Sequence, residues 1–148
     1  MRKTFPDAVR SRCRGPFAIN KSGCMILVDT SVWIRFLANR SPYADRLDNL
    51  LDRGEVAGHE LIYGELLIGD RGGRAKLLAS YEKMYQAKLV PHGDIVAFVR
   101  ARKLHGRGLG WIDVHLLASA IVERLQLWTA DNSFAAVANE LGIAGENS

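Results

Sequence analysis

Four acidic residues that are far apart in the sequence lie where a folded domain can bring them together. Asp29 and Asp131 each follow a short apolar run of strand length, and Asp113 and Glu65 lie in apolar helical patterns. Carboxylates that lie close together repel one another, so such a cluster needs a divalent cation to stay ionised. Because all of its ligands would be oxygen atoms, magnesium or manganese is favoured over zinc.

Glu65 is the acid that is hardest to explain as scaffolding. Leu61 and Ile62 precede it by four and three positions, which places all three residues on one helix face. A carboxylate on an inward face is costly unless it is paired or binds a cation. The alternative is a carboxylate at the rim that reaches solvent, and this helix alone leaves both interpretations open.

Each of the other three acids also has an ordinary structural interpretation. Asp29 can be a helix cap at a strand–helix turn, and Asp113 can cap its helix or place a favourable charge at the helix N-terminus. Asp131 can be a turn residue. Three acids after strands or at a helix start, together with one on an inward helix face, favour a shared site over four unrelated caps.

The elements that must position these acids alternate along the chain. Strands are predicted at residues 25–28, 55–57, 88–90 and 126–129. Helices are predicted from residue 30, around residues 47–51, and over 59–68, 75–85, 95–104, 113–125 and 133–141, with Asp94 as a cap. This alternation predicts an α/β domain with a mostly parallel sheet, in which sites form beyond the carboxyl ends of the strands.

The charge of the chain is concentrated near its start. Residues 1–24 hold six basic residues and one acid, so residues 25–148 carry a formal charge of −1 although the whole chain carries +4. The basic balance therefore says nothing about the partner of the domain. With 148 residues we expect one domain over residues 25–144, a poorly ordered N-terminal extension over residues 1–24 and a tail over 145–148.

Two further compositional features suggest where the protein works. The chain has only two cysteines, Cys13 and Cys24, and no segment that resembles a signal peptide. Both features fit a reducing cytoplasm. No apolar run is long enough to span a bilayer, so no membrane association is expected.

The segments around the four acids resemble the acidic motifs of PIN domains, in order and in spacing. These segments are residues 28–33, 64–69, 112–118 and 128–134. The resemblance extends from Met25 to about Leu141, and the size of the chain is closest to the VapC toxins of bacteria and archaea. One departure is that Asn132 and Ser133 follow the last acid, where the family often has a basic residue.

The resemblance implies a three-layer α/β/α fold and a metal-dependent endoribonuclease that cleaves structured RNA, such as transfer or ribosomal RNA. It also implies a homodimer that a VapB antitoxin neutralises. Asp29 and Asp113 would be the principal ligands of Mg²⁺ or Mn²⁺, and Glu65 and Asp131 would complete the cluster directly or through water. Ser31 would support the first aspartate.

A nuclease of this kind would use a metal-activated water for in-line attack on a phosphodiester. Five basic residues before Asp113 are candidates for contact with the RNA backbone, and the alternative is a solvated basic face: Arg100, Arg102, Lys103, His105 and Arg107. Arg107, which lies among glycines, is the best of them. Trp111 can stack on a base or simply pack, and Trp33 is expected in the core or at a dimer interface.

Two alternative functions follow from the same residues. A PIN fold can bind RNA or a partner protein without cleaving, although the presence of all four acids argues against it. A phosphate-transfer domain would also have an acidic pocket. A phosphatase, however, would have a second aspartate two positions after the first, where this chain has Ser31.

Overall fold

A computed structural model of the chain describes residues 24–145, and the N-terminal extension predicted from the sequence lies almost wholly outside this range. Three short parallel strands form the central sheet, in the order β2-β1-β3. They are β1 (Ile26–Val28), β2 (Val56–Ala57) and β3 (Gln126–Trp128). The parallel sheet that the sequence predicts is therefore confirmed.

The strands pair in register around β1. Ile26 lies opposite Val56 on one side and Gln126 on the other. A single bridge between Gly58 and Gln86 extends one edge of the sheet, and another, between Leu127 and Ala144, extends the opposite edge. Because all three strands run in the same direction, their carboxyl ends meet at one edge of the sheet.

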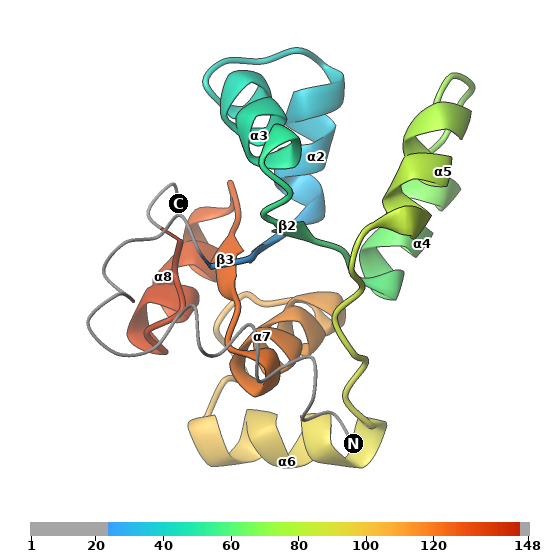
Figure 1. Cartoon of the computed structure of the whole chain (residues 1–148). Helices are drawn as coiled ribbons and strands as arrows, with labels where there is room; N and C mark the ends of the chain where they lie inside the picture. Colours follow the sequence, from blue (N-terminus) through green and yellow to red (C-terminus); the bar gives the residue numbers. More distant parts are fainter. Residues whose placement is uncertain (1–23, 146–148) are drawn as a thin grey trace.

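Seven helices surround the sheet in the described part of the chain. They are α2 (Thr30–Leu37), α3 (Tyr43–Asp52), α4 (Glu60–Ile68), α5 (Ala75–Lys83), α6 (His92–Arg102), α7 (Trp111–Glu123) and α8 (Asn132–Glu140). In Figure 1, α2 and α3 lie on one side of the strands and α6 and α7 on the other, which gives the expected three-layer α/β/α arrangement. Between residues 24 and 145, the helices are too short or too polar for any of them to traverse a lipid bilayer.

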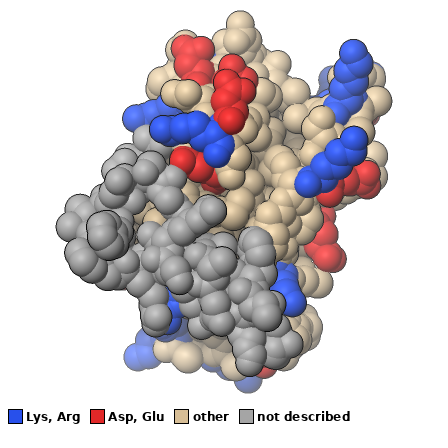
Figure 2. Space-filling model, viewed as in Figure 1, with Lys and Arg blue, Asp and Glu red and all other residues tan. Residues whose placement is uncertain are grey.

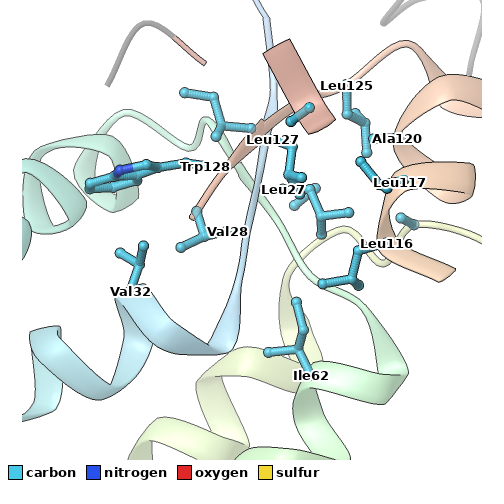
Figure 3. Packing of buried hydrophobic residues seen from close by; sticks show 14 of the residues in the cluster. Leu27, Val28, Val32, Ile62, Leu116, Leu117, Ala120, Leu125, Leu127 and Trp128 are labelled. Atoms are coloured by element: carbon cyan, nitrogen blue, oxygen red, sulfur yellow. The ribbon is translucent and has the colours of Figure 1, made fainter. Parts of the chain in front are cut away.

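The core is built around β1, whose three residues are all buried. A central strand of a parallel sheet is covered on both faces, which explains why it is apolar at every position instead of alternating. Figure 3 shows side chains from β1, β3, α4 and α7 meeting in this core, with Leu27, Leu127, Ile62 and Leu116 among them. The strand that ends at the first acid is thus held rigidly from both sides.

Two expected local features are wrong. Residues 88–90 do not form a strand, because side chains of α7 bind the main chain there: the Lys88 N–H donates to Glu123 (2.9 Å), and its carbonyl accepts from Ser119 (2.7 Å). Asp94 is not a cap, because α6 begins two residues earlier, at His92, and Asp94 lies in its first turn.

Candidate metal centre and active site

Asp29 follows β1 directly, and its carboxylate does not cap the next helix. Its side chain forms no capping hydrogen bond to α2. Instead, its Oδ2 atom accepts hydrogen bonds from the hydroxyls of Ser31 and Thr129, each at 2.8 Å. Within residues 24–145 no donor reaches the other oxygen, Oδ1. The helix-cap interpretation is therefore wrong for this residue, and one oxygen of a carboxylate that is 6% exposed remains available to a ligand.

The two hydroxyls that hold Asp29 are themselves fixed by the main chain of the segment after β3. Ser31 accepts a hydrogen bond from the N–H of Ala130 (2.9 Å), and Thr129 accepts one from the N–H of Asp131 (3.0 Å). Each hydroxyl therefore has its proton free to point at Asp29. Ser31, which was predicted to support the first aspartate, thus forms a hydrogen bond with its carboxylate. Thr129 was missed, although a threonine directly after a strand at the site edge was a signal for it.

Glu65 lies half-buried on α4, and its carboxylate is held by a residue of another helix. The Thr30 hydroxyl, at the start of α2, donates a hydrogen bond to Oε1 of Glu65. This contact connects the helix that follows β1 with the helix that carries Glu65. Thr30 was not singled out in the sequence, because nothing local indicates that its hydroxyl faces a residue 35 positions away.

Asp113 is the third residue of α7 and lies half-buried at the same edge. The N–H of Gly110 donates to its Oδ2 atom (2.8 Å), so this aspartate does cap the start of its helix. Burial raises its pKa, and the charges of Asp29, Asp131 and Glu65 raise it further, while the Gly110 hydrogen bond opposes them. The other three predicted acids therefore all lie close enough to act electrostatically on Asp113.

Asp131 is exposed and caps α8. Its Oδ1 atom accepts a hydrogen bond from the N–H of Phe134 (3.1 Å). One of the two carboxylate oxygens of Asp131, Oδ1, therefore has a structural role at the start of α8. Its charge still contributes to the raised pKa of Asp113, so it belongs to the same acidic edge.

The four carboxylates supply oxygen ligands alone, which suits magnesium or manganese. Across residues 24–145, no three acidic, histidine or cysteine side chains converge closely enough to form a ready-made cage for an ion. Such a cage is not what magnesium requires, because it keeps several waters and binds one or two carboxylates directly. The Oδ1 atom of Asp29 and the mutual repulsion around Asp113 therefore fit an ion held partly through water.

Arg107, the predicted RNA contact, lies on the exposed loop before α7 and points at an acid. Its guanidinium forms two hydrogen bonds with the Glu140 carboxylate of α8, at 3.1 and 2.6 Å. This partner offsets the charge of Arg107 and lowers the pKa of Glu140. The other basic candidates, at the end of α6 and just after it, are exposed.

Charges of both signs are spread over the surface. Figure 2 shows one face of the molecule, and the grey atoms on it are left out of account. On the remainder of this face, lysines and arginines stand in separate groups, and acidic side chains lie near several of them. The part of this face that is not grey therefore shows no continuous basic patch, in agreement with the nearly neutral charge of residues 25–148.

The fold and the acidic edge define the class of protein. Residues 26–140 match the PIN domain family, so this chain belongs to that family, as its motifs predicted.

Individual proteins that are similar to this chain support a more specific assignment within the PIN domain family. Over 121 residues the chain is 42% identical to Ribonuclease VapC32 of Mycobacterium tuberculosis, in each of two strains, and the alignment covers 81% of this chain and 95% of the relative. Among solved structures, it is similar to PAE2754 from Pyrobaculum aerophilum, with a TM-score of 0.50 and 18% identity. That alignment covers 76% of this chain and 78% of the other, and it supports the fold alone.

Proposed function

We propose that this chain is a metal-dependent endoribonuclease that acts as the toxin of a VapBC-type toxin–antitoxin pair. The observation that carries the proposal is the set of four acids at the carboxyl edge of a PIN domain, where three of them act electrostatically on the fourth, Asp113. The 42% identity to a VapC ribonuclease supports the same activity. The proposal assigns the catalytic domain to residues 25–144.

In this proposal, Asp29 and Asp113 hold Mg²⁺ or Mn²⁺, and Glu65 and Asp131 complete the site directly or through water. A bound ion supplies Lewis-acid stabilisation of the phosphate and a water of lowered pKa. The protein itself fixes the geometry: Ser31 and Thr129 orient Asp29, and Thr30 orients Glu65. Water is the nucleophile, so no covalent enzyme intermediate forms.

The substrate class and the partners follow from the VapC assignment. We propose that transfer or ribosomal RNA is the substrate in the cytoplasm, that the protein is a homodimer, and that a VapB-type antitoxin neutralises it. Mapping new RNA 5′ ends after a pulse of expression identifies the cleaved bond. Co-purification with the product of a neighbouring short gene tests the antitoxin.

The activity itself is tested with purified protein and a panel of RNAs in Mg²⁺, Mn²⁺ or a chelator. Cleavage should require the metal, and Asp29→Asn should lower the rate at least about 100-fold. Ser31→Ala, which removes only a support, should lower it about 10- to 100-fold. Asp48→Asn, the same chemical change at an exposed position on α3, is the matched control. Absence of metal-dependent cleavage in every RNA would instead favour a PIN fold that binds without cutting.

A further inference from the structure

Trp111 is an exposed tryptophan at the first position of α7. Its side chain is 47% exposed, whereas Trp33 and Trp128, the other two tryptophans of the chain, are each 1% exposed. The two buried rings belong to the core. The indole of Trp111, in contrast, keeps apolar surface that is open to a ligand.

Two imidazole rings hold the indole in place. His115, one turn later on α7, meets Trp111 edge-on with 5.4 Å between ring centroids. His92, at the start of α6, lies 5.4 Å away in a tilted arrangement. His115 is buried, and its Nδ1 atom has no hydrogen-bond partner within residues 24–145. The indole therefore packs against the buried ring of His115 and the exposed ring of His92, and still presents nearly half of its surface to solvent.

Trp111 lies close to the acidic edge. It is two residues before Asp113 in the same first turn of α7. Two residues advance a helix by about 3 Å and turn it by about 200°, so the two side chains leave opposite sides of the N-terminal end of α7, about one helix width of 10–12 Å apart. An RNA strand with a phosphate at the carboxylates would therefore bring a neighbouring base to the indole by crossing this end of the helix.

We propose that Trp111, held by His92 and His115, is a stacking platform for a nucleobase next to the phosphate bound at the carboxylate site. This inference rests on the proposed ribonuclease function and adds a subsite to it. Unpaired bases of RNA are commonly bound by stacking on aromatic side chains, and stacking tolerates any base because each has a π-face. A fixed ring loses little conformational freedom on binding, which favours the contact.

The test measures RNA binding apart from cleavage. A fluorescein-labelled single-stranded RNA of mixed sequence is titrated with Asp29→Asn protein, and anisotropy gives the dissociation constant. Adding Trp111→Ala should weaken binding about 5- to 100-fold, the range for loss of one stacked base. Trp111→Phe should largely retain affinity. Leu37→Ala, at an apolar position that is 39% exposed at the far end of α2, should change nothing.

Intrinsic fluorescence provides a second readout. Because Trp33 and Trp128 are buried, quenching by unlabelled RNA should come from Trp111 and disappear in Trp111→Ala. Equal RNA affinity with and without the indole would overturn the platform. Unchanged RNA affinity with a changed oligomeric state in sedimentation would also overturn it, because the ring would then belong to a protein contact.

The two proposals fail separately. If wild-type protein cleaves no RNA but binding depends on Trp111, the nuclease proposal fails and the stacking platform stands. If RNA is cleaved in a metal-dependent way but binding is indifferent to Trp111, the platform fails and the nuclease stands.

Discussion

The two ends of α7 each carry an acid in a very different environment. At the C-terminal end, Glu123 is 1% exposed, and both of its oxygens have donors: the Tyr85 hydroxyl and the Lys88 N–H. At the N-terminal end, Asp113 has a single donor among residues 24–145, the Gly110 N–H, and its pKa is raised by burial and by three other carboxylates. An acid that serves the fold is surrounded by donors. An acid left among like charges has the environment expected of the proposed metal site.

The largest effect that would sharpen this comparison is expected at Glu123. Glu123→Ala leaves the Tyr85 hydroxyl and the Lys88 N–H without their acceptor, which should lower the free energy of unfolding by about 2–4 kcal/mol. Glu123→Gln keeps one acceptor and should cost about 1 kcal/mol. Urea unfolding measures both. A loss of cleavage at full stability would instead make Glu123 part of the site.

His59 belongs to the structural part of the comparison, since it connects α4 with α7. It is fully buried, its Nδ1 accepts from the Leu61 N–H (3.1 Å), and its Nε2 lies 3.0 Å from the Ser119 hydroxyl. Burial, with a smaller contribution from His115, lowers its pKa from 6.5 to about 4. With Nδ1 accepting, the neutral ring donates from Nε2, and a second proton would disrupt the contact with Leu61.

The sign of the pH effect follows from that shift. Between pH 6.5 and 4 the unfolded chain binds a proton at residue 59 that the folded protein does not, so stability falls as the pH falls. Going from pH 7 to pH 5 should cost about 2 kcal/mol through this residue. His59→Asn keeps a capping oxygen and should show a correspondingly flatter profile in urea unfolding at both pH values. An equally steep profile would mean that His59 is not the titrating group.

Removing the charge of Asp113, at the N-terminal end of α7, should raise the stability of the metal-free protein, whereas the substitutions at Glu123 lower it. Asp113→Asn relieves the repulsion by three carboxylates and keeps an oxygen to accept from Gly110. Without metal, the variant should unfold about 2–4 °C higher than the wild type, although it loses cleavage. Differential scanning calorimetry in chelator measures this. A lower melting temperature would show that the Asp113 charge stabilises the fold.

The smallest effects are expected at an exposed ion pair between Arg107, on the loop that leads into α7, and Glu140, at the end of α8. Such pairs contribute little to stability, so neither Arg107→Ala nor Glu140→Gln should change unfolding measurably. If Arg107 contacts the RNA backbone, Arg107→Ala should reduce the slope of log Kd against log salt by about one. Glu140→Gln should tighten RNA binding a few-fold. An unchanged slope would show that Arg107 does not contact the RNA backbone and only pairs with Glu140.

Much of the fold was predictable, because it depends on local apolar patterns. The strands near Ile26, Val56 and Leu127 and all seven described helices were expected, with differences mainly at their ends. The strand at residues 88–90 was wrong because buried side chains of α7 bind that main chain, and no local pattern reports a contact made by a distant helix.

The four acids of the proposed site could be selected from the sequence, but the side chains that contact them could be selected only in part. Asp29 and Asp131 stand at strand ends, which the chain order alone reveals. The roles of Thr30, Thr129 and Glu123 depend on tertiary contacts over 35 to 100 residues, which a single sequence does not encode in any local pattern. Arg107 was chosen for its glycine neighbours, and its partner Glu140 lies 33 residues away.

The most direct test is the unfolding temperature during a titration with Mg²⁺ or Mn²⁺. An ion that binds the folded acids stabilises them by mass action, so the wild type should rise by about 5–10 °C once the ion exceeds its Kd about 100-fold. Asp113→Asn should start higher and barely rise, while Asp48→Asn should behave like the wild type. A flat wild-type curve, or an equal rise in Asp113→Asn, would contradict a metal site built from these four carboxylates.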